Sequence, residues 1–138
     1  MSSSVLVLDT HAWVRFVAGA PLSKRARGGI ERAAATGRGI LIPTISLWEI
    51  ARLSYDGRLK LGDRPERWFD AALATVSGEL APITPAIALM AAGLGCHADP
   101  ADRLIIATAI VHDSALVTRD QAILEFAATG RSLRIMEA

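Results

Sequence analysis

The sequence predicts an α/β protein, an open sandwich built on a parallel β-sheet. Two observations favour this fold class. Short apolar runs of strand length recur along the chain, and longer stretches with helical periodicity separate them. Strands that alternate with helices form parallel βαβ units with right-handed crossovers. With 138 residues and without an internal repeat or linker, the chain is expected to form a single domain over residues 1–138.

Five apolar runs are predicted as strands. The first, second and fourth are the clearest, because they are rich in leucine and β-branched residues. Proline ends the second run, the third is weak, and the fifth is expected at an edge of the sheet. In order, the predicted strands are VLVL (5–8), GILIP (39–43), API (81–83), ALVT (115–118) and LRIM (133–136).

The stretches between these strands are predicted as helices from the spacing of their apolar residues. The third of them is amphipathic and presents Leu47 and Ile50 on one face. Gly28 and Gly29 are expected to interrupt the second, because glycine is a poor helix former. The predicted helices cover residues 10–18, 22–36, 44–55, 65–77, 85–94, 100–112 and 121–129.

Composition predicts a soluble, cytoplasmic globule. Hydrophobic residues make up 51% of the chain and charged residues 21%, and the net charge of +1 neither indicates nor excludes a nucleic-acid partner. The single cysteine, Cys96, allows no internal disulfide, which suits a reducing compartment. The start of the chain has no basic region typical of a signal peptide. The longest uncharged stretch, 80–96, is too short for a membrane span and contains two prolines.

Four acidic residues lie close in sequence to the ends of predicted strands. In open parallel sheets, ligands bind beyond the carboxyl ends of the strands. Asp9 directly follows the first strand, and Asp120 comes two residues after the fourth. Glu49 lies in the first turns of the helix after the second strand, and Asp102 in the first turn of the helix before the fourth. We therefore expect these acids at one edge of the sheet.

Each acid also has a purely structural interpretation, because acidic residues are favoured in the first turns of helices. Asp9 and Asp120 can each cap the helix that follows, and Ser46 to Glu49 matches a capping box. Asp99 is interpreted as the N-cap of the helix that begins at Pro100, which leaves Asp102 as the better candidate ligand. The alternative to an enzyme is thus a non-catalytic α/β binding module whose acids are helix caps.

The convergence of four carboxylates favours a metal ion over caps alone. Asp9 belongs to an apolar segment, where an unpaired buried carboxylate is costly. Clustered carboxylates repel one another unless a positive charge lies between them, and few basic residues are placed to neutralise all of them. A hard divalent cation such as Mg²⁺ binds a few carboxylates and retains water.

Other chemistries find less support. The three histidines, His11, His97 and His112, lack zinc-site spacing, although His11 can line the acidic site. The phosphate-loop and Gly-x-Ser-x-Gly motifs are absent. An aspartyl-phosphate phosphatase needs an aspartate at position 11, and a receiver domain needs a lysine where Arg119 stands.

Four segments together resemble, in order and spacing, the motifs of the PIN-domain family, and within it most closely the VapC toxins of bacterial toxin–antitoxin pairs. They are VLVLDTHAWV (5–14), ISLWEIARL (45–53), HADPADRLIIATA (97–109) and LVTRDQAI (116–123). The resemblance implies a compact three-layer α/β/α sandwich with a central parallel sheet. It also implies ribonuclease activity at an acidic pocket that binds Mg²⁺ or Mn²⁺.

The resemblance carries the family's four acids, in order, onto Asp9, Glu49, Asp102 and Asp120. It places the family's polar residue near the fourth acid at Thr118. The first three acids would hold the ion, which activates a water for attack on a phosphodiester. The fourth would hold a second ion or support the ligands of the first.

The resemblance further implies an RNA substrate, a cognate VapB-type antitoxin and a homodimer. Four arginines close in sequence to the acids can hold phosphates or can be surface charges: Arg15, Arg52, Arg103 and Arg119. Trp48 and Trp68 can contact a protein partner or belong to the core. Because aromatic residues are only 5% of the chain, base stacking is expected to be a minor part of RNA binding.

Overall fold

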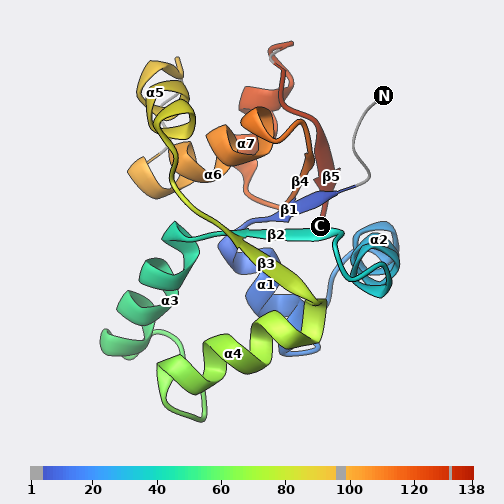
Figure 1. Cartoon of the computed structure of the whole chain (residues 1–138), viewed down its shortest axis with the longest axis vertical. Helices are drawn as coiled ribbons and strands as arrows, with labels where there is room; N and C mark the ends of the chain where they lie inside the picture. The colour runs from blue at the N-terminus through green and yellow to red at the C-terminus, as the bar shows by residue number, and fades with distance from the viewer. Residues whose placement is uncertain (1–4, 96–98, 131) are drawn as a thin grey trace.

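The computed structural model describes residues 5–95, 99–130 and 132–138. Strands and helices alternate along them as expected (Figure 1). The elements are β1 (Leu6–Leu8), α1 (Thr10–Val17), α2 (Lys24–Ala35), β2 (Ile40–Pro43), α3 (Ile45–Tyr55), α4 (Pro65–Val76), β3 (Gly78–Ala81), α5 (Pro85–Gly93), α6 (Pro100–Val111), β4 (Ala115–Thr118), α7 (Gln121–Ala127) and β5 (Ile135–Glu137).

The sheet is parallel throughout the described residues, in the order β3-β2-β1-β4-β5. Leu6 of β1 pairs with Ile40 of β2 on one side and with Ala115 of β4 on the other. The chain therefore starts in the middle of the sheet, builds outward to β3, and then crosses over to β4. The strand order thus reverses direction at β1, with β2 on one side and β4 on the other. In open parallel sheets, ligand sites form where the strand order reverses in this way.

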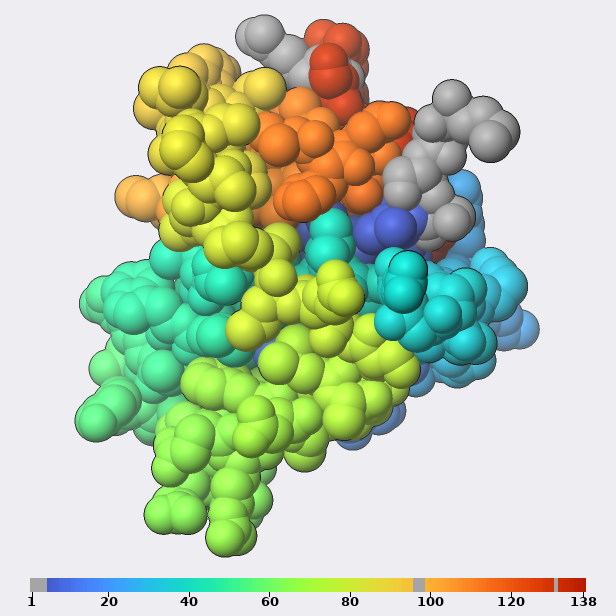
Figure 2. Space-filling view, viewed as in Figure 1, coloured from blue at the N-terminus to red at the C-terminus, as the bar shows by residue number. Residues whose placement is uncertain are grey.

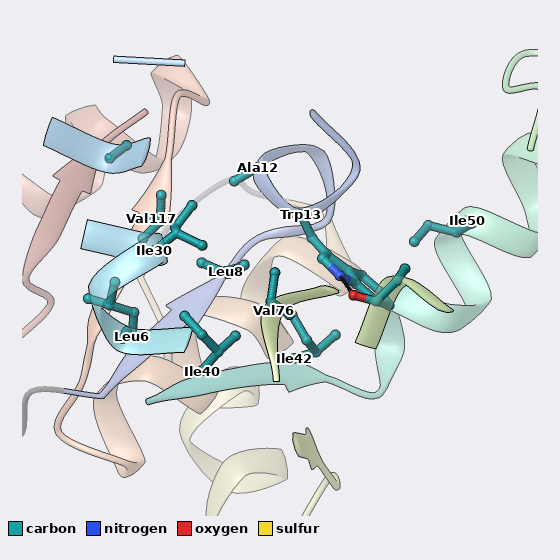
Figure 3. Close-up of a cluster of buried hydrophobic side chains, with 13 residues drawn as sticks. Leu6, Leu8, Ala12, Trp13, Ile30, Ile40, Ile42, Ile50, Val76 and Val117 are labelled. Carbon is teal, nitrogen blue, oxygen red and sulfur yellow. Dashed lines mark hydrogen bonds between the residues drawn. The ribbon is translucent and has the colours of Figure 1, made fainter. Parts of the chain in front are cut away.

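Side chains of β1 alternate between two cores, one on each face of the sheet. Leu6 and Leu8 pack with residues of α1, α2 and α4, as Figure 3 shows for Trp13 and Ile30 among others. Val7 faces the other way and packs with α6 and α7. Because successive strand side chains point to opposite faces, a fully apolar strand needs helices on both. The predicted three-layer α/β/α sandwich is confirmed.

Two tryptophans join α1 to α4 on the first of these faces. Trp13 is fully buried, and its indole N–H donates a hydrogen bond to the Ala72 carbonyl oxygen at 3.1 Å. The Trp68 ring meets Trp13 edge-on, with ring centroids 5.4 Å apart. Trp68 thus packs against the core, whereas Trp48 on α3 is 55% exposed.

Three sequence predictions were wrong in detail. The third strand covers 78–81 rather than 81–83, because Ser77 adopts a left-handed conformation that ends α4, and Gly78 already pairs with Ile40. The fifth strand begins at Ile135. Gly28 and Gly29 do not interrupt α2. Gly29 is instead a point of close packing, since a Cβ there would lie 2.8 Å from the sulfur of Met136.

None of the helices in the described part of the chain combines the length and the apolar character needed to cross a lipid bilayer.

Candidate active site

Asp9 lies at the carboxyl end of β1 and is only 4% exposed. Its Oδ1 accepts a hydrogen bond from the Ala12 backbone N–H at 2.7 Å, so it caps α1. Its Oδ2 accepts a hydrogen bond from the Thr118 hydroxyl. Burial raises the pKa of Asp9, and these two hydrogen bonds oppose that rise. Asp9 is therefore both a helix cap and a carboxylate fixed inside the protein.

Thr118, the last residue of β4, connects Asp9 to Asp120. Its hydroxyl donates to Asp9 and accepts from the Asp120 backbone N–H at 3.1 Å. Asp120 in turn caps α7 through the Ile123 N–H at 3.0 Å. Thr118 is fully buried, which leaves it no surface for RNA. Its hydroxyl instead orients the Asp9 carboxylate.

Glu49 is not part of a capping box. Helix α3 begins at Ile45, so Ser46 lies inside it, and within the described residues its N-cap, Thr44, makes no side-chain capping bond. Ser46 is buried and contacts the Thr10 hydroxyl at 2.8 Å. Thr10 in turn donates to Glu49 Oε1 at 2.5 Å. The contacts of Thr10 and Ser46 with this site were not predicted from the sequence, although a hydroxyl residue directly after Asp9 is a signal that points to Thr10.

Glu49 and Asp102 lie in an environment that disfavours their charge. Burial is the main cause of the raised pKa of Glu49, and repulsion from Asp99 and Asp9 adds to it. Burial, followed by repulsion from the surrounding acids, raises the pKa of Asp102 to about 7. The acids that repel Asp102 are Asp99, Asp120, Glu49 and Asp9. The structure thus brings the four predicted acids together.

Asp99 and Asp102 play different structural roles at the start of α6. Asp99 is the N-cap, and its carboxylate accepts from the Asp102 backbone N–H at 2.8 Å, as predicted. Because Asp99 fills the cap, the half-buried Asp102 carboxylate has no capping role. The first turn of α6 favours an acidic residue, but the other carboxylates around Asp102 disfavour its charge.

The residues present fit a hard divalent cation. Asp9, Glu49 and Asp102 all have raised pKa values because of burial and mutual repulsion, and attraction to His11 opposes this rise only for Asp9 and Glu49. A cation bound by carboxylate oxygens would offset this repulsion. Among the described residues, which do not include His97, no three acidic, histidine or cysteine side chains are already arranged so that they could hold a metal ion. Binding therefore needs an adjustment of side chains.

The four candidate arginines have different surroundings. Arg15 donates to the Pro21 carbonyl oxygen at 3.0 and 2.6 Å, and Arg119 reaches the same oxygen at 3.4 Å, so these two guanidinium groups lie together. Arg103 instead donates to carbonyl oxygens of Ala91 and Ala92 near the end of α5. These bonds satisfy carbonyls at a helix end and tie α6 to α5, which gives Arg103 a structural role.

A family model described as the PIN domain matches residues 6–129. The chain belongs to the PIN-domain family. This PIN domain is also 34% identical over 121 residues to Ribonuclease VapC22 of Mycobacterium tuberculosis, and the match covers 86% of the chain and 88% of that relative.

Two solved structures share the fold of this PIN domain. A DNA-bound VapBC2 complex of Rickettsia felis contains a chain with a TM-score of 0.69 and 20% identity, which covers 96% of this chain and 98% of that one. A DNA-bound VapBC of Salmonella typhimurium gives a TM-score of 0.64 at 19% identity, with 96% and 97% coverage.

The raised pKa of Asp102 makes the stability of the metal-free protein depend on pH. A carboxyl with a pKa of about 7 when folded and 3.8 when unfolded contributes stability that is present at low pH and lost as pH rises through about 7. In EDTA, the wild type should lose more free energy of unfolding between about pH 5 and about pH 8 than Asp102→Asn, by about 1–2 kcal/mol after allowance for solvent screening.

Urea unfolding of both proteins at the two pH values measures this difference. The raised pKa values of Asp9 and Glu49 leave a smaller slope of the same sign in the variant. Equal slopes for the two proteins would show that Asp102 is not held among the other acids.

Proposed function

We propose that this PIN domain, a single domain over residues 1–138, is a metal-dependent endoribonuclease and the toxin of a VapBC-type pair in the cytoplasm. The observation that carries the proposal is the convergence of Asp9, Glu49, Asp102 and Asp120 at the carboxyl ends of the strands, where Asp102 is repelled by the other three acids. The similarity to Ribonuclease VapC22 supports the reaction class.

Asp9, Glu49 and Asp102 would hold Mg²⁺ or Mn²⁺, with Asp120 beside them. When bound, the ion supplies Lewis-acid activation of water and neutralises charge at the phosphate. The protein contributes fixed geometry. Thr118 and the Ala12 N–H orient both oxygens of Asp9. Ligands held in place by such outer contacts need less rearrangement when the ion binds.

Arg15 and Arg119 are the best-placed groups to bind the RNA backbone. Both guanidinium groups converge on the Pro21 carbonyl oxygen, and ion pairs with acids do not engage them among the described residues. The segment 10–30 that contains Arg15 and Pro21 has no acidic residue. Two guanidinium groups that lie together offer forked donors that match phosphate oxygens.

A VapB-type antitoxin and a second copy of the chain are the proposed protein partners. The chain resembles proteins found in VapBC complexes. Edge strand β3, helix α5 and the segment between them lie at the surface in Figure 2 and carry exposed apolar side chains, with Leu89 at 76% exposure. The others are Leu80, Ile83 and Met90. Exposed apolar side chains of this kind are common in protein interfaces, and we assign this surface to the homodimer.

A binding module whose acids are caps remains the second candidate, because Asp9, Asp99 and Asp120 do cap helices. Glu49 and Asp102 do not cap a helix. A binding module whose acids are caps therefore does not explain these two residues.

Cleavage of total RNA by the purified protein, free of any partner, tests the proposed function. With Mg²⁺ or Mn²⁺ we expect cleavage at defined positions, and with EDTA no cleavage. Absence of cleavage with either ion, from protein shown to be folded by circular dichroism, would contradict the nuclease proposal and favour the binding module.

A further inference from the structure

A pocket of about 430 Å³ opens beside the acidic site, between α3 and the start of α6. Glu49 and Asp99 are among its lining residues, so the pocket adjoins the carboxylate cluster. Trp48, Arg52 and Arg58 line it from α3 and the turn that follows. Its volume is within the range of pockets that hold small-molecule ligands.

Trp48 has an unusual position for a tryptophan. Its ring is 55% exposed, although the other described tryptophans pack in or against the core. The guanidinium of Arg52 lies 5.5 Å from the centre of the Trp48 ring. An exposed indole next to a guanidinium offers flat surfaces on which an unpaired base can stack, and stacking of this kind does not depend on base identity.

The charges around the pocket favour a nucleotide rather than a simple anion. Carboxylates of Glu49, Asp56 and Asp99 line it and would repel an anion placed in its middle. A neutral base is not repelled, and its amino groups can donate to carboxylates. Arg58, which forms no ion pair among the described residues, and Arg52, which contacts Asp56 at 3.8 Å, can bind the phosphate of that nucleotide.

We propose that this pocket binds one unpaired nucleotide of single-stranded RNA next to the cleaved bond, with its base stacked on Trp48 and its phosphate at Arg52 and Arg58. The inference rests on the proposed ribonuclease function and specifies its substrate as an unstacked strand. A base must leave its duplex to use such a platform. From the aromatic content of the chain we expected base stacking to be a minor part of RNA binding. The proposal instead gives base stacking one defined position, on Trp48.

Binding of a short, fluorescein-labelled single-stranded RNA of mixed sequence, measured by anisotropy in EDTA, tests the proposal without cleavage. Trp48→Ala should weaken binding about tenfold, and Trp48→Phe should restore most of it. Tyr55→Ala is the matched control, because Tyr55 is a 91% exposed aromatic residue on the same helix outside the pocket, and binding should not change. Arg58→Ala should lower the slope of log affinity against log salt by about 0.7.

A second probe and a cleavage assay separate the outcomes. The duplex of the same sequence should bind with an affinity that does not depend on Trp48. If the wild type cleaves RNA with Mg²⁺ but Trp48→Ala binds the single strand as tightly as Tyr55→Ala, the pocket proposal is wrong and the nuclease proposal stands. If binding depends on Trp48 but neither ion supports cleavage, the pocket stands and the nuclease proposal falls. Loss of antitoxin inhibition alone in Trp48→Ala would assign the pocket to the protein partner and overturn the proposal.

Discussion

Asp102→Asn is expected to lower the rate of RNA cleavage by at least about 100-fold while the protein remains folded. The carboxylate of Asp102 lies among the other acids and does not cap α6, so asparagine removes a charged oxygen donor without removing a capping bond. Single-turnover cleavage at saturating Mg²⁺ or Mn²⁺ measures the loss, because it reports the chemical step rather than product release.

Asp113→Asn is the matched control for this variant. Asp113 follows the opposite end of α6, is exposed, and has a left-handed conformation that asparagine adopts readily. Its cleavage rate should equal that of the wild type. A fully active Asp102→Asn protein would contradict the assignment of Asp102 to the metal site, and equal losses in both variants would point to a general effect of charge.

Gly39→Ala is expected to destabilise the protein by about 3 kcal/mol. A Cβ at Gly39 would lie 2.3 Å from the carbonyl oxygen of Ala33 and 2.7 Å from its Cα. These atoms belong to the backbone near the end of α2 and cannot rotate away. Moving Gly39 instead would disturb the bond that its carbonyl oxygen accepts from the Leu6 N–H at 2.8 Å, where β1 meets β2. Urea unfolding measures the change.

The comparison for this substitution is Gly93→Ala. Gly93 is the last residue of α5, and a Cβ there meets no described heavy atom within 4 Å. Because alanine is the better helix former, that variant should be unchanged or more stable by less than about 1 kcal/mol. A Gly39→Ala protein as stable as Gly93→Ala would show that α2 does not pack against Gly39 as described.

The sequence predicts the centre of this fold better than its edge. Buried strands can be predicted from their apolar composition. VLVL and ALVT form β1 and β4 within one residue of the predicted bounds. The composition of the edge strand β3 is less clear, because its sequence GELA contains a glycine and a charged residue and is partly exposed. Its position depends on pairing with β2 across the sheet, a long-range interaction that local patterns do not contain.

For the candidate site, the positions of the acids could be predicted but their partners could not. From the sequence, helix cap and metal ligand were alternative roles for Asp9. In the structure, the two oxygens of its carboxylate have different partners. A helix cap can therefore also present a charge to the site. Glu49 owes its placement to Thr10, 39 residues earlier in the chain. Only the packing of α1 against α3 makes that contact, and no spacing rule encodes it.

The strand order has a consequence for the order in which the site is completed. Asp9 obtains its second hydrogen bond from Thr118, 109 residues later, and only when β4 has added to the free side of β1. The first acid of the chain therefore reaches its final geometry only after one of the last strands has joined the sheet.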